Sequence, residues 1–284
     1  MLDNCSLRSI GKIASIVLVS VCLIFSCASD EEVSEEDKEE LKIEFVELNS
    51  PDEILLINDS LVKPILYSRI MGIDTLPIDQ KKEKFIAAVL PAILVAKHRI
   101  KQKRTKVREL LEKKDWTAQD STFYLSLCEE YKTDVSSVLL NRMMVHPNSI
   151  ILAQAIIESG WGSSRVFQEA NNMFGIWSYS AKEPRIAAKY KRAQETIYLR
   201  KYHDFSESIQ DYFKTVARTN AYREFRMARL ETDDPFSLIK HLWRYSERGE
   251  EYVIQLSSMI RFNKLTQYDD YRIDPSYFQT ADNY

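Results

Sequence analysis

Two polar side chains stand among apolar residues between positions 150 and 158, and one of them is a carboxylic acid. Gln154 and Glu158 stand four residues apart, so on a helix they share one stripe of its surface. Glu158 falls on the last helical turn, where the negative end of the helix dipole and apolar neighbours both raise a carboxyl pKa. An acid still protonated near neutral pH suits general acid catalysis, such as protonation of a glycosidic oxygen. The alternative is a structural glutamate that is paired or reaches solvent.

The helix that must position this acid has recognisable start and stop signals. Pro147 ends the preceding segment, and Asn148 or Ser149 can cap the new helix. From 150 to 157 nearly every residue is apolar, which predicts burial around most of the helix. Gly160 supplies the left-handed residue that ends a helix.

Several separate blocks of the sequence resemble one known family. AQAIIESGWGSSRV at 153–166, followed by NNMFGIW at 171–177, resembles the core motif of bacterial N-acetylglucosaminidase domains of the flagellar-hydrolase type, which cut peptidoglycan. RYSERGEEYV at 244–253 is similar to the Bax-type branch of that family. The stretch at 81–100 resembles the region upstream of the domain in Bax-type proteins, so the resemblance covers about residues 80–265.

The resemblance implies an α+β, predominantly helical fold: a lysozyme-like domain with a small β-hairpin lobe. It implies a peptidoglycan hydrolase that cleaves the glycan chain after N-acetylglucosamine, with Glu158 as general acid. In the family the β-lobe often contributes a second carboxylate. We expect Glu195 at the hairpin turn in that role, or a solvated hairpin tip; Glu183 and Asp204 are the alternatives. Substrate assistance by the 2-acetamido group would make a second carboxylate unnecessary.

The resemblance also implies the residues that contact sugar. Tyr222, in TNAYREF, matches a family tyrosine at the cleft, where it could hydrogen-bond the acetamido group or orient water; core packing is the alternative. In the loop at 171–177, amides offer hydrogen bonds and flat aromatic rings suit pyranose rings, although such a loop can also plug the core. The predicted substrate-binding residues are Trp161, Asn172, Phe174 and Trp177.

Three other functions stay open at this point, one of which is a purely structural lipoprotein. A lytic transglycosylase also uses one glutamate after a helix, but it yields anhydro-muramic ends without water. A non-catalytic cell-wall-binding lipoprotein could keep the cleft for recognition alone.

Residues 1–26 have the layout of a lipoprotein signal peptide. Two basic residues precede an apolar run at 13–25, which is too short to span a membrane stably. The run ends in IFSC, which resembles the bacterial lipobox with Cys27 as the lipidated residue. Residues 27–41 read as an acidic disordered tether. We therefore expect a lipoprotein of the bacterial cell envelope, on the periplasmic face or cell surface; the alternative is a non-lipidated signal or a short anchor helix.

The remaining chain divides into three parts. We predict a helical N-terminal extension at 42–132, a glucosaminidase-like catalytic domain at 133–265 and an irregular tail at 266–284. Within the catalytic domain, alternating Tyr, Ile and Thr at 185–205 predict a β-hairpin.

Within the extension, the pattern predicts a long helix from Asp79 to about Lys114 that Pro91 bends or splits. Its second half is rich in Lys and Arg. We expect these cations to form a solvated face, with attraction to anionic lipid or acidic wall polymer as the alternative.

Charge and cysteine usage exclude several functions. The formal net charge is −3, and it becomes −4 without residues 1–26, which carry two basic groups and one acidic. No basic stripe interleaved with aromatics stands out, so nucleic acid is not an expected partner. Cys128 alone remains after residue 27, so no intramolecular disulfide is expected. The His residues lack ligand spacing, which predicts no metal and no cofactor. We expect a monomer whose partners are peptidoglycan glycan strands and the lipid membrane.

Overall fold

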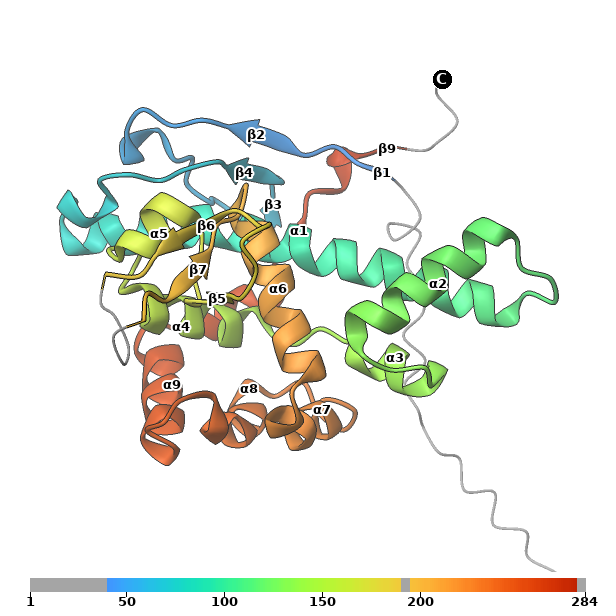
Figure 1. The fold of residues 1–284 in the computed structure, drawn as a ribbon. Coiled ribbons are helices and arrows are strands. Elements are labelled where there is room, and N and C mark those ends of the chain that lie inside the picture. Colours follow the sequence, from blue (N-terminus) through green and yellow to red (C-terminus); the bar gives the residue numbers. More distant parts are fainter. Residues whose placement is uncertain (1–39, 190–194, 280–284) are drawn as a thin grey trace, which may run out of the picture. The chain divides into compact units, whose positions relative to one another are not determined.

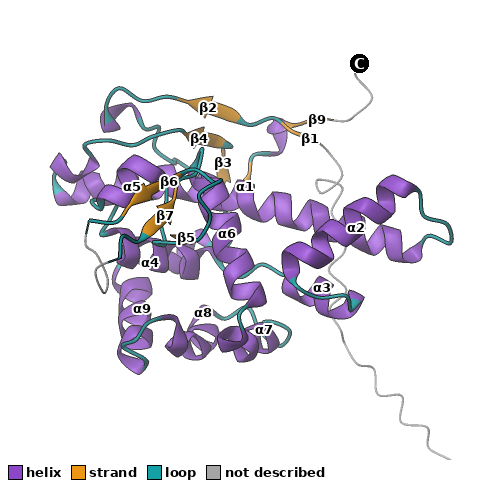
Figure 2. Ribbon diagram, viewed as in Figure 1, coloured by secondary structure: helices purple, strands orange, loops and turns teal. Residues whose placement is uncertain are grey.

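The structure is a computed structural model that describes residues 40–189 and 195–279, all within one unit. The predicted signal peptide, the lipidation site at Cys27 and nearly all of the tether lie outside these residues. Helices make up most of the described chain (Figure 2), which confirms the predominantly helical α+β fold. The helices are α1 Ile78–Glu112, α2 Ala118–Tyr131, α3 Ser136–Arg142, α4 Asn148–Ser159, α5 Arg165–Ala170, α6 Phe205–Arg218, α7 Arg223–Ala228, α8 Pro235–Leu238 and α9 Glu250–Phe262.

Helix α1 is the longest element, and it packs on both α4 and α6 (Figure 1). Pro91 lies inside the continuous helix and does not split it. Every residue from 87 to 96 is buried, so surrounding elements hold this part of α1 in place although the proline removes one backbone hydrogen bond. The chain before residue 133 therefore shares the core with the chain after it.

The cations of the second half of α1 are mostly not the solvated face that we predicted. Lys97 donates to a side chain of α4 at 2.6 Å, Arg99 to a side chain of α6 at 2.8 Å, and Arg104 to a backbone carbonyl of α3 at 3.0 Å. Burial lowers the pKa of Lys97 to about 8. Lys101 and Lys106 are exposed. Because neighbouring helices enclose α1, its long basic side chains join it to them.

Helix α4 lies at the centre of the core, and every residue from Asn148 to Ile156 is buried, as predicted. Neither Asn148 nor Ser149 caps it, which corrects the predicted start; Pro147 occupies the N-cap. The backbone N–H and hydroxyl of Ser149 instead donate to Asp269, both at 2.7 Å. The cap comes from a residue 120 positions away, which local sequence does not reveal.

The predicted hairpin is present as β6 (Arg185–Ala187) and β7 (Tyr198–Arg200), which pair antiparallel. A third strand, β5 (Trp177–Ser178), pairs with the other edge of β7, so the small lobe is a sheet of order β5-β7-β6. Its register sets Trp177 opposite Leu199. The lobe thus ties the end of the 171–177 loop to the hairpin.

Short strand pairs join the start of the described chain to its tail. The strands are β1 Glu40–Leu41, β2 Glu44–Val46, β3 Leu61–Val62, β4 Ile65–Tyr67, β8 Arg272–Ile273 and β9 Phe278–Gln279. β1 pairs with β9 and β3 with β8, while β2 pairs with β4. The tail that we expected to be irregular is therefore partly ordered up to 279, because partners far away in sequence supply its hydrogen bonds. Within the described ranges, no helix combines the length and apolar character needed to cross a bilayer.

Candidate active site

Glu158 lies on the last turn of α4 and lines a cleft of about 700 Å³. The helix ends where predicted, at Gly160, whose φ of 61° lies in the left-handed region. The other walls come from the 171–177 loop, β7, α6, the C-terminal end of α2 and the 3-10 segments that contain Tyr222 and Tyr245. Glu158 therefore lies in an open cleft whose walls come from several helices, a strand and a loop.

The carboxyl of Glu158 has the electrostatic character predicted from its position. The residue reaches solvent through the cleft, yet the protein around its carboxyl removes enough water to raise the pKa above the usual range. A hydrogen bond from Tyr252 and the charge of Arg248 partly offset that rise. The balance keeps the acid protonated to higher pH than a solvated glutamate, as a general acid requires.

A chain of hydrogen bonds runs from the buried His146 to Glu158. His146 Nε2 lies 2.9 Å from the hydroxyl of Tyr212, and that hydroxyl donates to Oε1 of Gln154 at 2.5 Å. Nε2 of Gln154 donates to the hydroxyl of Tyr252 at 3.3 Å, and Tyr252 donates to Oε1 of Glu158 at 3.1 Å. Gln154 and Glu158, which were predicted to share one side of the helix, thus both hydrogen-bond the hydroxyl of Tyr252 on α9.

This chain fixes the carboxyl in one orientation. The only proton of the Tyr212 hydroxyl goes to Gln154, so Nε2 of His146 must carry the proton that the hydroxyl accepts. Burial keeps the pKa of His146 well below its usual range, so its imidazole is neutral. Because Tyr252 occupies Oε1 of Glu158, the second carboxyl oxygen is left for the cleft.

Three of the predicted site residues line the same cleft as Glu158. Phe174 is nearly buried and stacks on Tyr212 with ring centroids 4.5 Å apart. Trp177 presents about a third of its surface to solvent and Tyr222 is nearly buried. Burial and the nearby charge of Glu158 raise the pKa of Tyr222, so its phenol stays protonated and can donate a hydrogen bond.

Two other predicted substrate-binding residues are not among those that line the cleft. Trp161 packs edge-on against Phe85 of α1 at 5.6 Å. Asn172 is almost fully buried; its amide donates to the carbonyls of Ile176 and Arg200, both at 3.0 Å, and accepts from the Ile176 N–H. These contacts hold the 171–177 loop against β7. Binding of sugar by Trp161 and Asn172 stays a prediction.

The three carboxylates considered for a second catalytic role have different surroundings. Glu195 is exposed and does not line the cleft. Glu183 accepts from the hydroxyl of Ser178 at 2.7 Å and pairs with Arg200. Asp204 is buried as the N-cap of α6. A catalytic role for Glu195 stays a prediction.

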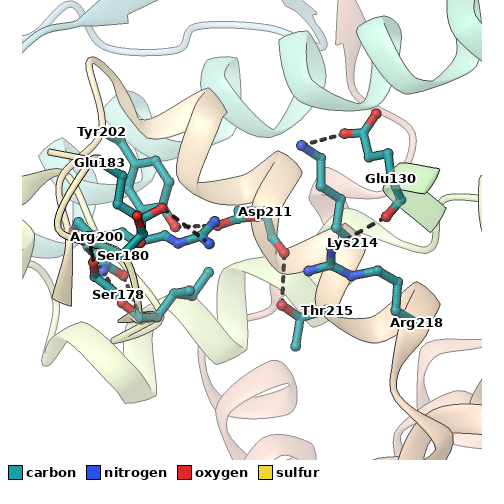
Figure 3. Close-up of polar contacts among 12 residues, drawn as sticks. Glu130, Ser178, Ser180, Glu183, Arg200, Tyr202, Asp211, Lys214, Thr215 and Arg218 are labelled. Carbon is teal, nitrogen blue, oxygen red and sulfur yellow. Dashed lines mark hydrogen bonds and ion pairs between the residues drawn. The ribbon is translucent and has the colours of Figure 1, made fainter. Parts of the chain in front are cut away.

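A carboxylate that we did not single out from the sequence shares the cleft with Glu158. Asp211 on α6 accepts from Arg200 at 2.6 Å and from the hydroxyl of Tyr202 at 2.7 Å, and Arg200 also pairs with Glu183 at 3.3 Å (Figure 3). This cluster joins the β-lobe to α6 at one side of the cleft.

Tyr252 and Tyr212 were also not identified as site residues from the sequence, although helical spacing gave a signal for Tyr252. Tyr252, Leu256 and Ile260 stand four apart and are all buried on α9, so helical spacing places Tyr252 on the inner face. No such signal links Tyr212 to Gln154. As for metals, the described residues contain no group of three or more His, Cys, Asp or Glu side chains that could hold an ion.

Comparisons with known proteins identify a family for the part of the chain that contains Glu158. The Glucosaminidase family model, described as mannosyl-glycoprotein endo-beta-N-acetylglucosaminidase, matches residues 136–280. Protein bax of Escherichia coli (strain K12) is 24% identical over 198 residues, which cover 65% of this chain and 70% of bax. Exo-glucosaminidase LytG of Bacillus subtilis (strain 168) is 33% identical over 94 residues, which cover 31% of this chain and only 33% of LytG.

Two solved structures are also similar to this chain, at lower sequence identity. The catalytic domain of the autolysin Auto from Listeria monocytogenes has a TM-score of 0.37 and 23% identity, over 59% of this chain and 87% of that domain. The glycoside hydrolase domain of FlgJ from Salmonella typhimurium has a TM-score of 0.34 and 22% identity, over 49% of this chain and 96% of that domain. The family model, by contrast, spans just over half of the 284 residues and includes Glu158 and Tyr252. The chain therefore belongs to the Glucosaminidase family and is a glycosidase.

Proposed function

We propose that this glycosidase hydrolyses the glycan strands of peptidoglycan after N-acetylglucosamine, with Glu158 as the general acid. The observation that carries the proposal is the Glu158 carboxyl, which faces an open cleft with a raised pKa and is oriented by Tyr252. The family description names an N-acetylglucosaminidase, and one relative is named an exo-glucosaminidase, which supports the sugar specificity.

In the proposed first step, Glu158 protonates the oxygen that links N-acetylglucosamine to the next sugar while the bond from that oxygen to the anomeric carbon breaks. Asp211 also lines the cleft, but its carboxylate already accepts hydrogen bonds from Arg200 and Tyr202, so we do not assign it the role of nucleophile. We therefore propose that the carbonyl oxygen of the substrate's own 2-acetamido group attacks the anomeric carbon. We propose that the phenol of Tyr222, which lines the cleft and has a raised pKa, hydrogen-bonds that acetamido group. Water then opens the resulting ring, and the Glu158 carboxylate takes up the proton.

The products test this proposal directly. Purified peptidoglycan digested with the full chain should give fragments with reducing N-acetylglucosamine ends, which mass spectrometry identifies. Anhydro-muramic ends would instead show lytic transglycosylase chemistry. Binding to peptidoglycan without any cleavage would leave only a wall-binding role.

Replacing Tyr252 with Phe should move the alkaline limb of the pH–rate profile to higher pH. The general acid works in its protonated form, so activity falls as pH rises through the pKa of Glu158. The hydroxyl of Tyr252 lowers that pKa, and its removal therefore extends the protonated form to higher pH. Loss of orientation should also lower kcat about tenfold.

The measurement is kcat/KM against pH for wild type, Tyr252→Phe and a control, Tyr268→Phe, which alters a partly buried tyrosine that does not line the cleft. An alkaline limb that stays in place in Tyr252→Phe would show that this hydroxyl does not act on the catalytic acid.

A further inference from the structure

The cleft carries positive charge that neutral sugars would not need. Lys132 and Arg218 line the same cleft as Glu158. Lys132 is the C-cap of α2 and therefore lies before residue 136, where the family match begins. The N-terminal extension thus contributes a charged side chain to the active-site cleft.

Neighbouring cations on this side of the molecule are neutralised by acidic partners. Glu130 pairs with Lys214 at 2.5 Å (Figure 3). It also pairs with Lys103 at 3.9 Å. Arg200 pairs with Asp211 at 2.6 Å. Across the described part of the chain, by contrast, no carboxylate forms an ion pair with Lys132 or Arg218. These two cations therefore present net positive charge to the cleft.

Both cations sit on a fixed framework. The guanidinium of Arg218 donates to the backbone carbonyl of Glu130 at 3.3 Å. Lys132 has a φ of 54°, in the left-handed region, and its carbonyl accepts from Arg142 at 2.7 Å. A non-glycine residue at such a φ is uncommon, although it is a frequent way to end a helix. In α2, this left-handed position is occupied by Lys132 rather than by glycine, and Lys132 lines the cleft.

Lys132 and Arg218 are not the cations that shift the pKa of the catalytic acid. Arg248 is the cation whose charge lowers the pKa of Glu158. Lys132 and Arg218 therefore suit a part of the substrate away from the scissile bond. In peptidoglycan, N-acetylglucosamine is neutral, whereas muramic acid bears a lactyl branch that ends in a carboxylate or in a peptide with carboxylates of its own.

We propose that Lys132 and Arg218 form an anion subsite that binds a carboxylate on the lactyl branch of the substrate, supplied by the branch itself or by its peptide. The subsite rests on the proposed function, because it assumes a peptidoglycan strand in the cleft. It makes the N-terminal extension a determinant of substrate choice: strands with carboxylate branches bind better than uncharged chitin-type strands.

Binding to the full chain carrying Glu158→Gln tests the subsite without turnover. The three probes are a chitooligosaccharide, which has no carboxylate, a peptide-free glycan fragment with lactyl carboxylates, and a fragment that retains its peptides. Adding Lys132→Gly should weaken binding of at least one carboxylate-bearing probe about threefold and leave chitooligosaccharide binding unchanged. The probe affected identifies the source of the carboxylate. Added salt should shrink the difference, because the cations lie at a solvated rim.

Lys264→Gly is the matched control. Lys264 is also an exposed lysine in the left-handed region, with a φ of 52°, and it lies outside the cleft. Glycine adopts this conformation without strain, so both variants keep the fold and lose one charge. Lys132→Arg should restore the binding of the affected probe.

Three outcomes would overturn the subsite: equal binding by Lys132→Gly and Lys264→Gly, equal weakening of all three probes, or no binding of any probe. Failure of the proposed function is read separately, from the absence of any cleavage of peptidoglycan by the wild-type chain.

Discussion

Replacing Glu158 with Gln should lower the rate of glycan cleavage by about a hundredfold to ten-thousandfold, the range that a general acid supplies. Glutamine keeps the size and the oxygen that accepts from Tyr252, so the hydrogen bond at 3.1 Å and the fold should persist. What it loses is the proton that the leaving oxygen needs. Reducing ends released from purified peptidoglycan, measured with time, give the rate, and substrate binding should survive.

Glu195→Gln is the informative companion to this variant. Glu195 is exposed and lies outside the set of residues that line the cleft. If the acetamido group supplies the nucleophile, Glu195→Gln should keep activity close to that of wild type. A loss as large as that of Glu158→Gln would instead support Glu195 as the second carboxylate. Retention of full activity by Glu158→Gln would contradict its role as the acid.

The sequence predicted those parts of the site that local signals encode. The burial of α4, its end at Gly160 and the position of Glu158 follow from one apolar run and one glycine. The helix start was predicted with the wrong cap, because Asp269, far along the chain, supplies the capping oxygens to Ser149. Local pattern is informative about a helix, but not about a cap that comes from another part of the fold.

The surroundings of Glu158 were harder to predict for the same reason. Tyr252 and Tyr212 come from α9 and α6, and they meet Gln154 only when these helices pack on α4. In the sequence, Asp211 is one of several polar residues of an amphipathic helix, and its contact with Arg200 forms only when β7 packs beside α6. The pKa and orientation of the acid therefore depend on tertiary contacts, whereas its presence depends on the motif.

Replacing Phe85 with Ala should destabilise the catalytic region by about 3–5 kcal/mol, although Phe85 belongs to the predicted N-terminal extension. Phe85 is fully buried on α1, and its ring lies 5.6 Å from the rings of both Trp161 and Phe167. Phe167 in turn stacks on Phe205 at 4.5 Å. Truncation leaves a cavity between α1 and the segment that follows Glu158. Such a loss is a large share of the roughly 5–15 kcal/mol that stabilises a typical domain.

Urea unfolding followed by circular dichroism and by loss of activity measures this effect, with Phe262→Ala as the matched control. Phe262 is 83% exposed, so its truncation should change the free energy of unfolding by less than about 0.5 kcal/mol. In Phe85→Ala both signals should shift together to lower urea with an unchanged slope, because one core spans the extension and the catalytic region. If activity were lost at the wild-type urea concentration while part of the circular dichroism signal shifted, the extension would fold independently, and Lys132 could not be a fixed part of the cleft.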